Sequence, residues 1–123
     1  MGQTFITISA ILGFLGVGLG AFGAHGLKAK LSADMMVVFE TAARYHLIHA
    51  VALLGIGILA RQMDVTAIKV AGIAMIFGIL VFSGSLYGLA ISGIRILGAI
   101  TPIGGLGLMV GWAALVVAAI QNP

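Results

Sequence analysis

The sequence predicts an all-α integral membrane protein, a single domain folded as a four-helix up-down bundle. Four apolar stretches each approach the roughly 20 residues that a helix needs to cross about 30 Å of hydrocarbon. With 62% hydrophobic and 7% charged residues, the chain has too little polar surface for a water-soluble globule. Short connections favour antiparallel neighbouring helices. The predicted spans are residues 4–24, 45–60 with an interfacial extension from residue 33, 70–91 and 101–120.

The first, third and fourth spans contain glycines three or four residues apart. This spacing places small residues along one edge of a helix, where another backbone can approach closely in lipid. We expect these edges to pack helices within the bundle, or against a second copy or partner subunit. The helix-packing glycines are Gly16, Gly20, Gly23, Gly84, Gly88, Gly107 and Gly111.

The second helix is predicted to begin before the membrane. Ser32 is a suitable N-cap, and Asp34 complements the positive end of the helix dipole. Neither Gly nor Pro interrupts the helix before Gly55. Glu40 and Arg44 are four residues apart in the favourable order, so we expect them to form an ion pair.

The last two spans have their own boundary signals. We expect the third span to end near Ser92. The fourth is predicted to open at Thr101 and Pro102, because Thr is a natural N-cap and Pro suits the first helical position. Within that span, the indole N–H of Trp112 needs an acceptor, although packing is its expected role.

Most polar side chains fall on one side of the membrane, in or near the loops that follow the first and third spans. His46 and His49 are three residues apart and therefore point along one face of the second helix. Ionisable groups are costly in lipid unless they face the bundle, a partner or a wet cavity, so this side is the candidate ligand-binding site. Its residues are His25, Glu40, Arg44, Tyr45, His46, His49, Ser83, Ser85, Tyr87, Arg95 and Thr101.

The histidines allow two interpretations. His25, His46 and His49 have donor atoms for zinc or copper, and Met35 and Met36 would add soft ligands for Cu(I). However, their spacing matches no zinc signature, and no attachment motif supports a haem. Cys is absent, which excludes disulfides and thiolate sites. We favour hydrogen-bonded structural histidines, with no metal or cofactor.

Five motifs occur in an order that is similar to a known family. In this order the motifs resemble the domain-of-unknown-function family 423, small bacterial membrane proteins similar to eukaryotic transmembrane protein 256. The resemblance spans nearly the whole chain. It implies four helices in a bacterial cytoplasmic (inner) membrane and supplies no activity, substrate or cofactor. The motifs are Gly20-Ala21-Phe22-Gly23-Ala24-His25 with Leu27, Tyr45 with His49, Phe82-Ser83-Gly84-Ser85-Leu86-Tyr87, Thr101-Pro102-Ile103-Gly104-Gly105, and Gly111-Trp112.

Two signals give opposite orientations in the membrane. Basic tails in members of the resembled family imply that both termini are cytoplasmic, and we expect this arrangement. The positive-inside rule instead places the polar side in the cytoplasm. That side holds Lys28, Lys30, Arg44 and Arg95, against Arg61 and Lys69 on the other.

The sequence supports three hypotheses for function. We favour a noncatalytic membrane module, a homo-oligomer or a subunit of a larger membrane complex, with the lipid bilayer as its surroundings and no nucleic-acid partner. This choice follows from the small-residue edges and from the lack of a nucleophile with an oriented base. The alternative is an oligomeric carrier or pore for a small or lipidic ligand through the polar cluster. The third hypothesis is a metal or redox site built on the histidines.

Overall fold

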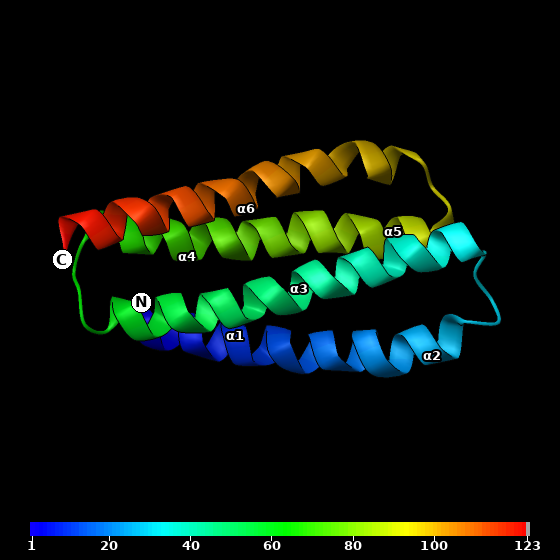
Figure 1. The fold of residues 1–123 in the computed structure, drawn as a ribbon, viewed down its shortest axis with the longest axis horizontal. Coiled ribbons are helices and arrows are strands. Elements are labelled where there is room, and N and C mark those ends of the chain that lie inside the picture. Colours follow the sequence, from blue (N-terminus) through cyan, green and yellow to red (C-terminus); the bar gives the residue numbers. More distant parts are fainter. Residues whose placement is uncertain (123) are drawn as a thin grey trace.

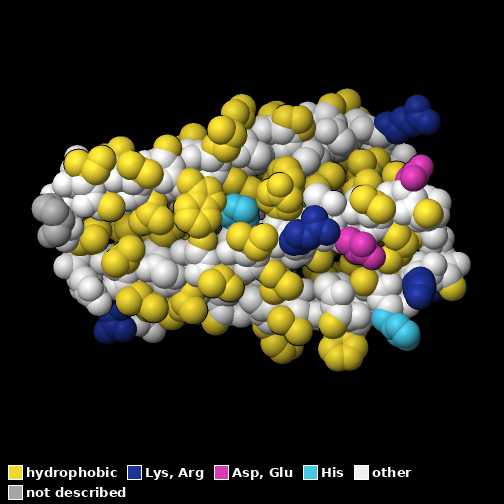
Figure 2. All heavy atoms as spheres, in the orientation of Figure 1, with side chains coloured by type: hydrophobic (Ala, Val, Ile, Leu, Met, Phe, Trp, Pro, Cys, Tyr) yellow, Lys and Arg dark blue, Asp and Glu magenta, His cyan; other side chains and the backbone are white. Residues whose placement is uncertain are grey.

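The computed structural model describes residues 1–122 and confirms an all-α membrane protein, since the described chain contains no strand. Four helical segments are long and apolar enough to cross a membrane. They are Gly2–Leu27, Ala33–Ala60, Thr66–Ser92 and Ile96–Gln121. Hydrophobic side chains cover most of the face drawn in Figure 2, with only a few charged groups among them. Such a surface suits lipid rather than water.

Two of the spans change helical pitch along their length. The first consists of α1 (Gly2–Val17), a π-helical segment η1 (Gly18–Gly23) and α2 (Ala24–Leu27), and the second is α3 (Ala33–Ala60). The third consists of α4 (Thr66–Gly78), a π-helical segment η2 (Ile79–Ser83) and α5 (Gly84–Ser92), and the fourth is α6 (Ile96–Gln121). A π-helical turn leaves backbone groups displaced from the usual ladder, so the side chains after it point in a new direction.

The four spans form two antiparallel hairpins that meet along α3. The span containing α1 packs mainly on α3, and the span containing α4 packs mainly on α6. Contacts of α3 with α4, η2 and α5 join the two hairpins. Figure 1 shows the spans in the order first span, α3, the span of α4 and α5, and α6. The start of α1 and the end of α6 lie at the same end of the bundle (Figure 1). The predicted up-down topology is therefore confirmed.

The start of α3 follows its predicted cap. The Ser32 side chain accepts a hydrogen bond from the Met35 backbone N–H at 3.2 Å, and Asp34 lies in the first turn. The helix then runs without interruption to Ala60. An uninterrupted helix of this length exceeds the thickness of the hydrocarbon, as the sequence predicts.

The predicted start of the fourth span was wrong, because α6 begins at Ile96 rather than at Thr101. Gly93 ends the third span in the left-handed conformation, with φ of 73°, and the chain turns directly into the next helix. Thr101 is therefore no cap, and its hydroxyl donates to the Leu97 carbonyl at 3.1 Å within the helix. Pro102 lies inside α6, where its missing N–H deprives the Gly98 carbonyl of its usual donor.

The apolar core lies in the half of the bundle nearer the start of α1. Phe5, Leu53, Ile56, Ile68 and Met75 are almost completely buried there. The other half of the bundle buries polar side chains as well as apolar ones such as Phe39, and these polar side chains form the candidate site.

Candidate functional site

His46 connects three spans through both nitrogens of its ring. Its Nε2 lies 2.7 Å from the Leu12 carbonyl oxygen in α1, and its Nδ1 lies 2.9 Å from the Tyr87 hydroxyl in α5. A carbonyl only accepts, so Nε2 carries the hydrogen. In the neutral ring Nδ1 then accepts from the Tyr87 hydroxyl. The imidazole thereby holds α3 against both of its neighbours.

A glycine allows His46 to reach the backbone of α1. A Cβ at Gly16 would lie 2.6 Å from Leu47 Cδ2 and 3.4 Å from the His46 ring. A side chain at this position would therefore require the Leu47 side chain, or α3 itself, to move. The hydrogen bond from His46 to the Leu12 carbonyl depends on this close approach of α1 and α3. Gly16 lies one turn after Leu12 on α1 and faces the same histidine ring.

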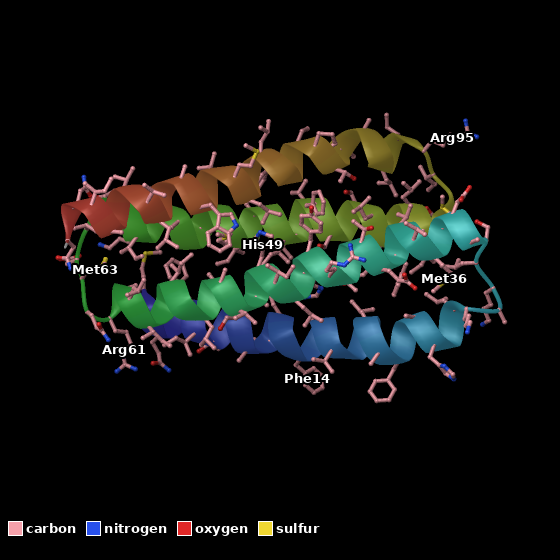
Figure 3. The ribbon with its side chains drawn as sticks, viewed as in Figure 1. Phe14, Met36, His49, Arg61, Met63 and Arg95 are labelled. Atoms are coloured by element: carbon pink, nitrogen blue, oxygen red, sulfur yellow. The ribbon has the colours of Figure 1, made fainter. Side chains whose placement is uncertain are left out.

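His49 forms a second bridge, between α3 and α6. The Trp112 indole donates from Nε1 to His49 Nε2 at 3.1 Å, and His49 Nδ1 donates to the Tyr45 carbonyl at 2.7 Å. Indole nitrogen is only a donor, so Nε2 of His49 must be unprotonated. Figure 3 shows His49 reaching from α3 into the space between the helices. The expected acceptor for Trp112 is thus a histidine ring.

Hydroxyl groups of the third span complete the network. Ser83 is buried and donates to the Ala42 carbonyl of α3 at 2.8 Å. Ser85 and Thr101 lie 2.6 Å apart and join α5 to α6. Of these two hydroxyls, one donates to the other and the second donates to a carbonyl of its own helix. Within residues 1–122, every buried side-chain nitrogen and oxygen has a partner.

A groove of about 590 Å³ lies beside this network, between α3 and α6. Tyr45 packs on Phe82 with ring centroids 4.7 Å apart, and His49 meets Trp112 edge to face at 5.9 Å. The walls of the groove are therefore largely aromatic and apolar. Its lining residues are Tyr45, His49, Phe82, Pro102, Gly105, Leu106, Leu108, Met109 and Trp112.

Four residues of the predicted site lie outside the network. His25, Glu40, Arg44 and Arg95 are all exposed, and Arg95 lies at the far end of the bundle from Arg61 (Figure 3). The expected ion pair between Glu40 and Arg44 does not form. The described residues contain one salt bridge, which joins Lys69 and Asp64 at 3.3 Å.

The three histidines do not come together as the alternative of a metal or redox site on His25, His46 and His49 would require. Gly23 of the first span faces α3 through Phe39. Two residues later along a helix the side chain points about 200° away, so His25 faces outward. In the part of the chain that the structure describes, no group of three His, Cys, Asp or Glu side chains could hold a metal ion.

Several members of the network were not predicted from the sequence as site residues, among them the carbonyls of Leu12 and Ala42 and the indole of Trp112. The Leu12 carbonyl belongs to a helix, where a backbone acceptor has no sequence signal of its own. Only the neighbouring Gly16 indicates that a second helix comes close enough to use it. Trp112 was expected to pack, but its need for an acceptor was a usable signal for the bond to His49.

We expect His49→Ala to lower the free energy of unfolding by about 1 kcal/mol or less, a typical value for hydrogen bonds between membrane helices. One of the two bonds of His49 lies within α3, and Trp112 remains 44% exposed beside the groove. Trp112 is the single tryptophan of the chain, so fluorescence reports on it alone. Its emission should shift to shorter wavelength as the indole loses its acceptor. An unchanged spectrum would show that the two rings are not bonded in the membrane.

The chain is similar to known membrane proteins over almost its whole length. A family model described as protein of unknown function (DUF423) matches residues 19–105. A UPF0382 membrane protein of Staphylococcus epidermidis is 45% identical over 119 residues, covering 97% of each chain. The UPF0382 membrane protein YwdK of Bacillus subtilis is 44% identical over 120 residues, covering 97% of this chain and 98% of its own. No solved structure matches.

Proposed function

The chain belongs to the DUF423 family of membrane proteins, whose function is unknown, and from this membership we propose that it is a noncatalytic membrane module. In this proposal it associates with copies of itself or with a larger membrane complex. The names of its relatives describe membrane proteins and state no activity.

The observation that carries this proposal is the use of both histidine rings in helix packing. All four ring nitrogens of His46 and His49 are engaged in hydrogen bonds within the bundle. A general base needs a free lone pair near its substrate, and a metal ligand needs one directed at the ion. The hydrogen-bond network of His46 and His49 therefore supports a structural role, in which it sets the register of the four spans.

Small residues on the outer faces support association. Gly84 is exposed on α5, and a Cβ built there would contact nothing within 4 Å. Gly16, Gly20 and Gly23 lie against α3 instead, and Gly107 and Gly111 lie against the span containing α4. Gly88 lies against Leu97 of α6, so Gly84 is the predicted packing glycine at which an added Cβ would contact nothing.

We also propose that the protein lies in the bacterial cytoplasmic membrane with both termini in the cytoplasm. Bacterial relatives support the compartment. The orientation rests on the basic tails of family members, which imply cytoplasmic termini. Because the chain has no cysteine, single cysteines introduced at Gln62 and at Ala29 would report the two sides separately. Labelling of Ala29→Cys alone by an impermeant maleimide in intact cells would support the proposed orientation, and labelling of Gln62→Cys alone would reverse it.

Native mass spectrometry of protein released from its own membrane tests the proposed association. We expect masses of several copies or of an added subunit, and we expect Gly84→Leu to reduce the masses with an added subunit at least about tenfold by blocking close approach at α5. Gly16→Leu is the contrasting variant. It should unfold the bundle, because its Cβ already meets Leu47. A wild-type protein that is released only as single copies would contradict the proposal, and a retained lipid would favour a carrier that uses the groove between α3 and α6.

A further inference from the structure

Two opposite charges lie one turn apart on the outer face of α3. Glu40 and Arg44 are both exposed, whereas His46 and Phe39 of the same helix face the interior. Neither charge lies within 4 Å of an opposite charge on the described residues, whose single salt bridge joins Lys69 and Asp64. The two groups are thus unpaired within this chain.

These charges interrupt a surface that is otherwise apolar. Arg44 lies about 24 Å, and Glu40 about 30 Å, along the helix from Ala60, at a rise of 1.5 Å per residue. On the same helix Val37 is 62% exposed before them and Val51 is 69% exposed after them. Charged groups at such a position are costly unless they are paired, or reach a headgroup or water.

We propose that this face of α3 is an interface between two copies of the chain, in which Glu40 of each copy pairs with Arg44 of the other. The inference rests on the proposed self-association and assigns the contact between two copies to α3, which leaves the open Gly84 of α5 for an added subunit. A two-fold axis along the membrane normal keeps both copies in the same orientation, so the two α3 helices run parallel. Side chains on a helix lean toward its N-terminus, and Arg44 therefore reaches back to the level of Glu40 in the second copy.

The surface beside the charges allows a close approach. A hollow of about 370 Å³ lies between the first span and α3, with Glu40 and Arg44 at its edge. Much of its wall consists of small residues, which let another helix come near. These residues are Gly20, Ala21, Ala24 and Ala43.

Charge complementarity favours a second copy over a lipid headgroup. A neutral pair of opposite charges is complementary to itself when it is rotated by a two-fold axis, and both groups then find a partner. An anionic headgroup would bind Arg44 but would be repelled by Glu40, which would stay unpaired. The headgroup explanation therefore predicts that only the charge at Arg44 matters.

Charge reversal with two differently tagged copies in the same membrane tests the interface. Glu40→Arg alone and Arg44→Glu alone should each reduce co-purification of the two tags at least about tenfold, because like charges then meet. Copies carrying Glu40→Arg should associate with copies carrying Arg44→Glu, since every pair across the interface is again opposite. The double variant Glu40→Arg/Arg44→Glu should recover self-association.

The mixture separates the interface from effects inside α3. Each single variant places like charges four residues apart on its own helix, and mixing does not repair that repulsion. Recovery in the mixture must therefore come from contacts between copies. Asp34→Arg is the matched control, because it reverses an exposed charge in the first turn of the same helix. It should leave association unchanged.

A second measurement remains informative if a charge variant folds poorly. The chain has no cysteine, so Ile48→Cys on the same outer face, with the native charges in place, should form a cross-linked dimer on mild oxidation. Absence of that dimer, or a mixture that fails to associate, would overturn the interface. If all charge variants self-associate like the wild type, this interface is wrong while self-association stands. If the wild type carries another subunit and no second copy, the interface is wrong and the accessory form of the proposed function is supported.

Discussion

Gly104→Ala is expected to lower the free energy of unfolding by about 1–3 kcal/mol, the usual cost of overpacking a tight contact. A Cβ at Gly104 would meet the backbone nitrogen of Phe82 and would lie 2.6 Å from its Cα. A backbone cannot rotate away as a side chain can, so α6 would have to move off η2. Unfolding in detergent micelles by titration with a denaturing detergent, followed by circular dichroism, measures the loss.

Gly105→Ala is the matched control on the next residue of the same helix. Its Cβ would lie 3.6 Å from Cδ2 of the Phe82 ring, which is an ordinary van der Waals contact. Replacing Gly by Ala in a helix also favours the helix by up to about 1 kcal/mol. We therefore expect Gly105→Ala to be neutral or stabilising. Equal losses for the two variants would mean that the close contact of Gly104 with the Phe82 backbone does not control the outcome.

His46→Leu is expected to cost about 1–3 kcal/mol, because it removes two hydrogen bonds between helices and leaves the half-buried Tyr87 hydroxyl without its partner. Tyr87→Phe removes only the hydroxyl and should cost less. A double-mutant cycle of the two substitutions isolates the bond between them. We expect a coupling energy of about 0.6 kcal/mol, and no more than about 1.7 kcal/mol, as in other membrane helices.

The comparison with His49→Ala distinguishes the two histidines. His46 joins three spans, whereas His49 bonds its own helix and α6. If His49→Ala destabilises the bundle as much as His46→Leu, the bonds of His46 to two neighbouring spans contribute no more than the bonds of His49. A coupling energy near zero between His46 and Tyr87 would show that these groups are equally well satisfied in the separated helices.

Local signals predicted the spans and the start of α3. Hydrophobic length identifies a membrane helix without reference to its neighbours, and Ser32 caps backbone groups three residues away. The start of α6 escaped prediction because the cap signal at Thr101 competed with the turn at Gly93, which acts first along the chain. The local sequence is compatible with a helix that starts at Thr101 and with one that starts just after Gly93. The packing of the helices selects the earlier start.

The sequence predicted which types of residue form the candidate site, but it did not predict which of their side chains point into the bundle. The polar side chains of α3 and of the third span do meet, since His46 reaches Tyr87 and Ser83 reaches Ala42. The outward direction of His25 depends on which glycine of the first span faces α3. That choice is made by contacts over a long separation in sequence, which no local pattern contains.

The arrangement in two hairpins bears on how the protein is made. Each hairpin can enter the bilayer as a unit during translation, since its two helices already contact each other extensively. At that stage His46 can reach Leu12, but Ala42 and His49 still lack Ser83 and Trp112, which are synthesised later. A first hairpin that waits alone would therefore expose unsatisfied polar groups to lipid. Docking of the second hairpin supplies Tyr87, Ser83 and Trp112, so the polar groups of the first hairpin become fully bonded only when all four spans have been made.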